Sequence, residues 1–270
     1  MAVKLALAQT TSSLKWEENV MKAERYIKEA KRQGVKLILF PEYFMMYYPS
    51  EEINYRNEAQ SLDGPFVSRM KELAKQYEMW IIAGMNEDSL DKEKSYNTIV
   101  LIDDSGRLAA RYHKNHLFNA FSCQESEDTL EGQNMFIPVD SPAGVIGMGC
   151  CYDLRFPEVA RLAALGGAQV MFYPSAWVKG NMKYEQWESL LRARAIENEM
   201  YVFGCCHYSP MHYMGRSIGF DPMGEKIIEG EEKEQLLVCE IDLGKIQKVR
   251  RDNPVFENRR TDLYSLLYKK

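Results

Sequence analysis

The sequence predicts an α/β fold in which mixed β-sheets are layered by helices. Apolar, strand-like runs alternate with amphipathic segments of helical period through most of the chain, which is typical of sheets flanked by helices. Turn-rich pairs of strands interrupt this alternation, and such hairpins add antiparallel strands to parallel ones. With 270 residues, of which 46% are hydrophobic and 27% charged, the chain can build one large domain with a substantial core.

The first half of the chain supplies two strand–helix units and a hairpin. Strands are predicted at 3–9, 35–40, 80–85, 96–102 and 107–114, and helices at 17–32 and 65–77. The run 35–40 is almost continuously apolar, which is expected when both faces of a strand are covered. Asp and Gly residues at 103–106 indicate the turn of the hairpin.

The second half repeats the strand–helix–strand theme and closes with hairpins. Strands are predicted at 143–150, 169–173, 201–206, 217–220, 225–228 and 235–241, and helices at 156–165 and 184–199. Residues 115–134 are polar and irregular, which in a compact domain favours a functional loop. No internal repeat or low-complexity linker is visible, so we expect a single domain over residues 1–270, with 253–270 as a C-terminal tail.

Composition and charge exclude several classes of function. The formal net charge is −5 and the basic residues are scattered, so we expect no nucleic-acid partner. The sequence shows neither an export signal nor an apolar stretch of roughly 18 residues, so we expect no membrane partner. The six cysteines have no spacing typical of a disulfide framework, which indicates reduced thiols and a cytoplasmic protein.

The segment 147–158 is the centre of the predicted active site. An apolar run there ends at two cysteines, Cys150 and Cys151, and Pro157 suits the first turn of a following helix. A nucleophile on such a turn is exposed at the carboxyl edge of a sheet, beside backbone amide donors. Because successive side chains of a strand point to opposite faces, we assign Cys151 to the pocket and Cys150 to packing.

Two further polar residues, Glu42 and Lys114, also follow apolar strands. Taken singly, such residues are usually solvated, and a lone cysteine is usually an inert buried side chain. Because ligands bind at the carboxyl ends of strands in layered α/β proteins, we expect the three to converge. Glu42 could then take the thiol proton, while Lys114 and the backbone amide of Tyr152 could stabilise the negative charge of a tetrahedral intermediate.

Together these residues carry a resemblance to a known family. The chain resembles the nitrilase superfamily of carbon–nitrogen hydrolases, most closely its omega-amidase and aliphatic amidase branch. The similarity extends over nearly the whole chain and rests on motifs at residues 40–42, 112–118, 151–158, 173–177 and 192–198. It implies a four-layer αββα sandwich, and it implies the same roles as argued above, with Glu42 as general base, Lys114 as stabilising cation and Cys151 as nucleophile.

The resemblance also implies a second catalytic glutamate in the loop after the lysine. We assign this role to Glu125, although Glu127 and Asp128 lie close enough in sequence to be alternatives. We expect neither a cofactor nor a metal. Proteins of this family usually pair across their outer helices, so we expect a homodimer or larger homo-oligomer in which the tail 253–270 packs on a partner subunit.

The predicted function is hydrolysis of a non-peptide C–N bond in a small aliphatic amide, through a cysteine thioester that releases ammonia and a carboxylic acid. The substrate-binding residues that we expect are Tyr152, Arg155 and Trp177. Arg155 could hold a carboxylate at the far end of a dicarboxylic acid monoamide. Alternatively, Arg155 forms a structural bridge with an acid such as Glu158.

Other functions remain open at this stage. N-carbamoyl amino acid hydrolysis and nitrile hydrolysis use the same four residues, and a binding scaffold could keep the fold without turnover. A metal site built from His113, His116 and the cysteines lacks a complete set of ligand spacings. A serine hydrolase is disfavoured because the Gly-x-Ser-x-Gly match at 215–219 leads into a hairpin strand.

Overall fold

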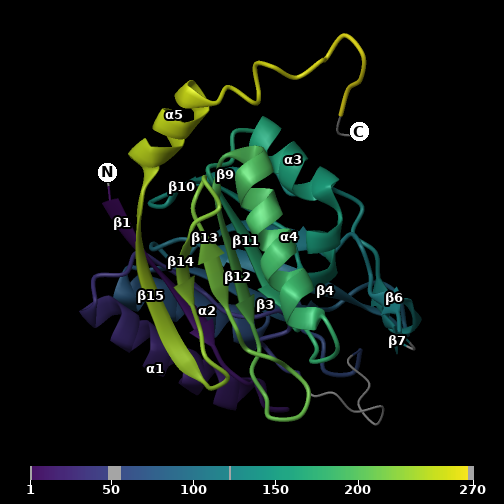
Figure 1. Cartoon of the computed structure of the whole chain (residues 1–270). Coiled ribbons are helices and arrows are strands. Elements are labelled where there is room, and N and C mark those ends of the chain that lie inside the picture. Colours follow the sequence, from purple (N-terminus) through teal and green to yellow (C-terminus); the bar gives the residue numbers. More distant parts are fainter. Residues whose placement is uncertain (1, 48–55, 122, 267–270) are drawn as a thin grey trace.

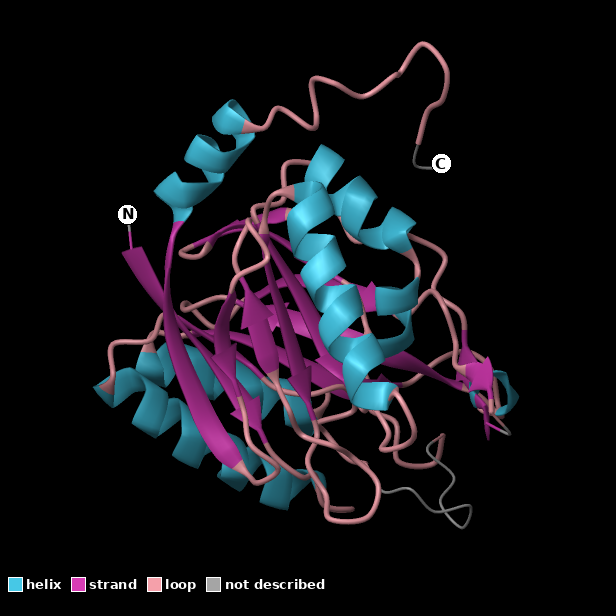
Figure 2. Ribbon diagram, in the orientation of Figure 1, coloured by secondary structure: helices cyan, strands magenta, loops and turns pink. Residues whose placement is uncertain are grey.

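The computed structural model describes residues 2–47, 56–121 and 123–266, and it has two stacked sheets between two layers of helices (Figures 1 and 2). The helices α1 (Trp16–Arg32) and α2 (Pro65–Tyr77) cover the outer face of one sheet. The helices α3 (Pro157–Leu165) and α4 (Lys183–Asn198) cover the outer face of the other. The predicted αββα sandwich is therefore confirmed.

The first sheet has seven strands in the order β15-β1-β2-β3-β4-β5, with β8 paired to β4. Its central strands β1, β2 and β3 are parallel, whereas β15, β4 and β5 run antiparallel to their neighbours. The strands are β1 (Ala2–Gln9), β2 (Leu37–Leu39), β3 (Trp80–Glu87), β4 (Ser95–Ile102), β5 (Leu108–His113), β8 (Thr129–Leu130) and β15 (Gln235–Asp242).

The second sheet has six strands in the order β14-β13-β12-β11-β10-β9, again with three parallel strands at its centre. The strands are β9 (Val139–Ser141), β10 (Gly144–Met148), β11 (Val170–Ser175), β12 (Tyr201–Cys206), β13 (Ile218–Phe220) and β14 (Lys226–Glu229). The connection between the sheets carries a small hairpin of β6 (Asn119–Ala120) and β7 (Cys123–Gln124), followed by the 3-10 turn η1 (Glu125–Glu127).

The strand period assigns neighbouring residues to two different clusters of the core. On β2, Leu37 and Leu39 belong to the cluster that fills the space between the two sheets and continues under α3 and α4, whereas Ile38 belongs to the cluster under α1 and α2. All three side chains are fully buried. Both faces of β2 are therefore covered, which explains why its sequence is continuously apolar instead of alternating.

The sequence analysis missed several short elements. The helix α5 (Leu243–Asp252) was not predicted because it buries only Ile246 and Val249, so its apolar period is weak. Its start is fixed by Asp242, whose carboxylate accepts a hydrogen bond from Gly244 N at 3.0 Å. The loop 115–134 contains β6, β7 and β8, each of two residues and too short to leave a periodic pattern. Of the predicted tail, residues 267–270 lie outside the described part of the chain.

No helix in the described ranges is both long and apolar enough to cross a membrane.

The segment that follows β2 crosses β3 at unusually short range. A Cβ atom at Gly84 would lie 2.2 Å from the backbone nitrogen of Tyr43 and 2.7 Å from the carbonyl carbon of Glu42. Two backbone hydrogen bonds hold the crossing, from Gly84 N to Pro41 O at 3.2 Å and from Met45 N to Gly84 O at 2.9 Å. The position of Glu42 therefore depends on the absence of a side chain at Gly84.

Replacing Gly84 by Ala should lower the free energy of unfolding by about 1–3 kcal/mol, because the added methyl group can be accommodated only by moving backbone. Urea denaturation measures this change. Gly244→Ala is the matched control, since Gly244 is exposed on α5 and an added Cβ there meets only the Asp242 side chain, at 3.3 Å. Equal denaturation midpoints for Gly84→Ala and the unmodified protein would contradict the tight crossing.

Candidate active site

Residues that follow the ends of three strands meet at one cavity of about 260 Å³. Glu42 follows β2, Lys114 follows β5, and Cys151 follows β10. The structure thus brings together the three residues that the sequence placed at strand ends. The other predicted site residues line the same cavity, namely Glu125, Tyr152, Arg155 and Trp177.

The Glu42 carboxylate is only 2% exposed and accepts four hydrogen bonds. Its Oε1 accepts from Asn97 Nδ2 at 2.7 Å, Lys114 Nζ at 2.9 Å and Cys150 Sγ at 3.3 Å. Its Oε2 accepts from the backbone N–H of Ala176 at 2.7 Å. Burial by itself raises the pKa of this carboxyl, but the Lys114 ammonium and the hydrogen-bond donors together hold the pKa below its usual value. Glu42 is therefore an ionised base at neutral pH.

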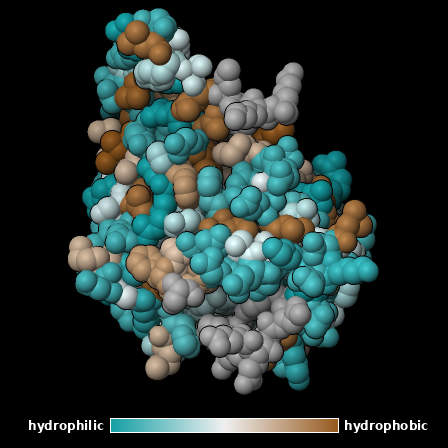
Figure 3. Space-filling view, turned by 90° about the vertical axis from the view of Figure 1, so that its right-hand side faces the viewer, coloured by the Kyte–Doolittle hydropathy of each residue, from teal (hydrophilic) through white to brown (hydrophobic). Residues whose placement is uncertain are grey.

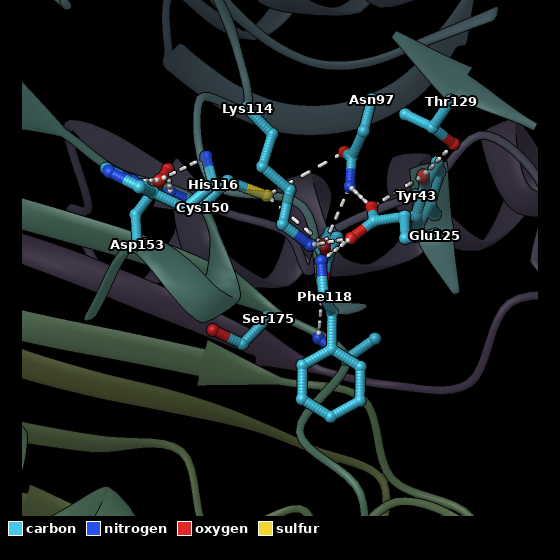
Figure 4. Close-up of polar contacts among 12 residues, drawn as sticks. Tyr43, Asn97, Lys114, His116, Phe118, Glu125, Thr129, Cys150, Asp153 and Ser175 are labelled. Carbon is cyan, nitrogen blue, oxygen red and sulfur yellow. Dashed lines mark hydrogen bonds and ion pairs between the residues drawn. The ribbon is translucent and has the colours of Figure 1, made fainter. Parts of the chain in front are cut away.

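Lys114 is a buried ammonium held between two carboxylates, and Figure 4 shows its side chain directed toward Glu125. Its Nζ donates to Glu42 Oε1 at 2.9 Å and to Glu125 Oε2 at 2.7 Å. Burial lowers the pKa of Lys114, but Glu125 and Glu42 more than offset it and raise the pKa well above its usual value. Glu125 is itself fixed, because it accepts from Phe118 N at 2.6 Å and from Tyr43 Oη at 3.1 Å.

The contacts of Lys114 distinguish Glu125 from its two acidic neighbours. Within the part of the chain that the structure describes, Lys114 forms ion pairs with Glu42 and Glu125 and not with Glu127 or Asp128. Glu127 is exposed, and Asp128 accepts a hydrogen bond from the Thr129 hydroxyl at 2.8 Å. The geometry therefore gives the bridging position to Glu125.

Cys151 lies on a strained turn between β10 and α3. It begins the 3-10 turn η2 (Cys151–Arg155) with φ +44°, a value that non-glycine residues rarely adopt. Burial, and then the negative charge of Glu42, raise the pKa of the Cys151 thiol well above its usual value. The resting thiol is therefore protonated and lies beside an ionised carboxylate that can accept its proton.

Cys150 is more than a packing residue. Because β10 already ends at Met148, the alternation by which we separated the two cysteines does not extend to them. Cys150 is fully buried, yet its Sγ donates to Glu42 Oε1 at 3.3 Å and lies 3.7 Å from Asn97 Oδ1. It therefore supports the base, although it does not belong to the residues that line the cavity.

Asp153 fixes the turn that carries the two cysteines. Its Oδ2 accepts hydrogen bonds from Cys150 N and Tyr112 Oη, each at 2.8 Å. Its Oδ1 lies 2.6 Å from His116 Nδ1 and accepts from His116 N at 3.1 Å. The side chain is completely buried, so these partners satisfy a carboxylate that water cannot reach. The backbone geometry of Cys151 therefore depends on Asp153.

The other sequence motifs are used structurally. His116 binds Asp153, and His113 binds Glu87 at 2.9 Å, so different carboxylates hold the two histidines. Among the described residues, no group of three or more His, Cys, Asp and Glu could hold a metal ion. Ser217, the serine of the Gly-x-Ser-x-Gly match, is fully buried and accepts from Cys206 N at 2.9 Å.

Asn97 is a site residue that the sequence analysis missed. Its Nδ2 donates to Glu42 Oε1 at 2.7 Å and to Glu125 Oε1 at 3.0 Å, so one amide bridges both carboxylates. Asn97 is 1% exposed and lies within β4. Its only sequence signal is an amide at the start of an apolar run, where an asparagine is unfavourable unless it is hydrogen-bonded.

Arg155 lies at the cavity without the structural bridge that we considered. Its Nη2 donates to Gln186 Oε1 at 2.7 Å, and its guanidinium carbon is 4.8 Å from the ring centroid of Trp177. Within the described residues it forms no ion pair with Glu158, which is exposed. Its charge is therefore available to a ligand in the cavity.

Comparison with known proteins shows extensive similarity to one family. The family model described as carbon-nitrogen hydrolase matches residues 4–251. The omega-amidase NIT2 of Homo sapiens is 33% identical over 278 residues, covering 99% of this chain and 98% of that protein. The deaminated glutathione amidase of Bos taurus is 34% identical over 278 residues, covering 97% of this chain and 84% of that protein.

A third relative is similar in both sequence and structure. The nitrilase and fragile histidine triad fusion protein NitFhit of Caenorhabditis elegans is 34% identical over 275 residues, which are 97% of this chain and 62% of that protein. The crystal structure of that protein superposes with a TM-score of 0.90, over 98% of this chain and 66% of the other. The similarity thus involves the complete layered fold and is not confined to one motif.

Replacing Asn97 by Ala should lower kcat for ammonia release from short amides about 10- to 100-fold, because hydrogen bonds to charged groups contribute about 1.5–3 kcal/mol. Thr98→Val is the matched control, since Thr98 is the next residue of β4 and donates instead to Glu87 Oε2, at 2.8 Å. Thr98→Val should reduce stability and keep kcat. Equal losses of kcat in both variants would show that Asn97 acts only through the fold.

Proposed function

The chain belongs to the carbon–nitrogen hydrolase family, within the nitrilase superfamily, and we propose that it is an amidase acting on small aliphatic amides. The observation that carries the proposal is the position of the Cys151 thiol, at the same cavity as an ionised Glu42 and a charged Lys114. A protonated thiol beside a base and a cation is suited to acyl transfer. The relatives named omega-amidase and deaminated glutathione amidase support an amide as the substrate class.

The first half of the reaction forms a thioester. Glu42 takes the proton from Cys151 as Sγ bonds to the amide carbonyl carbon, and the carbonyl π electrons move onto oxygen. The Lys114 ammonium and the backbone N–H of Tyr152 stabilise this oxyanion. When the tetrahedral intermediate collapses, the C–N bond breaks, Glu42 returns the proton to nitrogen, and ammonia leaves.

The second half regenerates the thiol. A water molecule replaces ammonia, and Glu42 takes one of its protons as the oxygen attacks the thioester carbon. Collapse breaks the C–S bond, Glu42 protonates the sulfur of Cys151, and the carboxylic acid is released. One carboxylate serves as base and acid in each half, which requires that its position stay fixed through the cycle. The hydrogen bonds from Asn97 and Ala176 supply that constraint.

Glu125 contributes by holding Lys114. It shares the ammonium with Glu42 and is anchored by the backbone of Phe118. If Glu42 were the only acid beside Lys114, the pair would carry no net charge, and the ammonium would have no anionic partner whenever Glu42 was protonated. With Glu125 present, the ammonium stays charged whether Glu42 is ionised or protonated. Lys114 can therefore stabilise an oxyanion at the stage when Glu42 carries the thiol proton.

The size and charge of the cavity favour a short acyl chain that ends in a carboxylate. A cavity of about 260 Å³ suits a small molecule. Arg155 presents its guanidinium to this cavity, and a guanidinium binds a carboxylate through two parallel hydrogen bonds. We therefore propose the monoamide of a short dicarboxylic acid as substrate, and N-carbamoyl amino acids and nitriles are the comparisons in an ammonia-release screen.

We also propose that the single domain pairs through the outer face of α3 and α4. Exposed apolar side chains gather there, with Leu165 at 37%, Ile196 at 48% and the neighbouring Met223 at 62% exposure. The tail adds the exposed Leu263 and Tyr264. On the face that carries β6 and β7, by contrast, hydrophobic residues form small separate patches among hydrophilic ones (Figure 3).

The two adjacent cysteines test the mechanism. Cys151→Ala should abolish ammonia release and leave the fold unchanged by circular dichroism, because Cys123, the other described thiol that lines the cavity, is exposed on β7 and has no described hydrogen bond to Glu42. Cys150→Ala should cost about 1 kcal/mol of stability and leave substantial turnover, since it removes a buried sulfur that only supports Glu42. Turnover that persists in Cys151→Ala and is lost in Cys150→Ala would reverse the assignment.

Sedimentation equilibrium tests the pairing. The unmodified chain should sediment as a dimer or larger assembly at micromolar concentration, and Ile196→Glu should shift it toward the monomer by burying a charge in the interface. Met21→Glu is the control, because Met21 is 61% exposed on α1, in the opposite helical layer. A monomeric unmodified chain would rule out the proposal.

A further inference from the structure

Lys183 brings a positive charge to the cavity from the first turn of α4. It lines the cavity, and among the described residues no carboxylate lies within ion-pair distance of its Nζ. Its neighbours are aromatic instead, with Nζ 4.3 Å from the ring centroid of Phe121, 5.6 Å from that of Phe118 and 5.8 Å from that of Trp177. Such rings attract a cation without neutralising it, so the ammonium keeps its charge for another partner.

Arg155 is a second cation at the cavity that lacks an acidic partner among the described residues. Its described partners are the neutral amide of Gln186 at 2.7 Å and the rings of Trp177 and Tyr152, at 4.8 and 6.0 Å from the guanidinium carbon. Arg155 and Lys183 thus lie over the same indole. Two like charges that share one aromatic surface repel each other unless an anion binds between them.

The electrostatics of Lys183 agree with this geometry. Burial, and then the charge of Arg155, lower the pKa of Lys183 from its usual value. Lys179, four residues earlier, shows what an ordinary lysine does in this region, because its Nζ pairs with Glu232 at 3.5 Å and donates to Pro210 O at 3.0 Å. The cavity lysine has no such acid partner in the described part of the chain.

The acids of the cavity are already engaged on other elements. Glu42 and Glu125 share Lys114, and Asp128 is bonded by Thr129. These residues follow β2 or lie in and after η1, whereas the two cations come from η2 and α4. The cavity therefore has a reacting end with bound carboxylates and a second region where positive charge is uncompensated.

We propose that Lys183 and Arg155 form a two-cation clamp for the carboxylate at the far end of the acyl chain, which makes Lys183 a specificity-determining residue. The proposal rests on the proposed amidase function and goes further by naming the group that selects the substrate. The guanidinium donates two hydrogen bonds to the carboxylate oxygens, and the ammonium donates a third. A neutral diamide satisfies neither cation, so the clamp discriminates against it through two charges left desolvated and unpaired.

Paired substrates measure this discrimination. Succinamic acid and succinamide have the same carbon chain and differ in the terminal carboxylate. Lys183→Gln should lower the ratio of kcat/KM between the acid and the diamide about tenfold or more, mainly by raising KM for the acid, and Lys183→Arg should restore much of it. Lys179→Gln removes the same charge from the neighbouring loop and should leave the ratio unchanged.

An alkylation experiment separates this proposal from the amidase proposal. 5-Chlorolevulinic acid and its methyl ester each alkylate a thiol by forming an S–C bond and expelling chloride, while the base takes the thiol proton. In the unmodified chain, mass spectrometry should show that the acid labels Cys151 faster than the ester at equal concentration. That preference should fall about tenfold in Lys183→Gln. Labelling with this preference but without ammonia release would overturn the amidase function and keep the clamp.

The unmodified protein provides a third measurement that needs no variant. Succinate should protect Cys151 from the methyl ester at lower concentration than succinamide, because only succinate can occupy the clamp. Equal protection by the two compounds would overturn the clamp, and so would a charge preference that is the same in Lys183→Gln and the unmodified chain. A loss of preference in Lys179→Gln equal to that in Lys183→Gln would show a general surface effect and would also overturn it.

Discussion

The ammonium of Lys114, buried between Glu42 and Glu125, is the interaction on which the rest of the site depends. Removing three charges from water is costly, and the cost is offset only when every remaining lone pair has a donor. The donors come from distant parts of the chain, including Asn97 on β4, the Ala176 amide after β11 and the Phe118 amide of the loop. The site therefore forms only where the edges of both sheets meet.

The excess negative charge of Glu42, Glu125 and Lys114 together sets the protonation state of the Cys151 thiol. Two carboxylates share one ammonium, and the nearer of them, Glu42, raises the pKa of the Cys151 thiol together with burial. A preformed thiolate would add another anion to a region that is already anionic. In the reaction that we propose, the thiol therefore keeps its proton until an electrophilic carbon is in place, and proton transfer to Glu42 accompanies attack. This arrangement protects a buried cysteine from unproductive reaction.

Polar residues that follow the end of a strand could be predicted from the sequence, whereas polar residues inside a strand or an α-helix could not. Glu42 and Cys151 each follow an apolar run, so a local pattern located both. Asn97 lies within β4 and Lys183 in the first turn of a helix, where an amide and a lysine have many ordinary explanations. The choice of Glu125 among three nearby acids needed the family resemblance, because only the distant contacts to Lys114 and Phe118 distinguish it.

The separation of charge within the cavity determines how a substrate can lie in it. A monoamide acid bound with its carboxylate over Trp177 places opposite charges together at Arg155 and Lys183, and its amide carbon then extends toward Cys151. In the reverse orientation the carboxylate approaches Glu42 and Glu125, which repel it, and the two cations stay unpaired. In the clamp that we propose, electrostatics thus selects both the substrate and the orientation that leads to reaction.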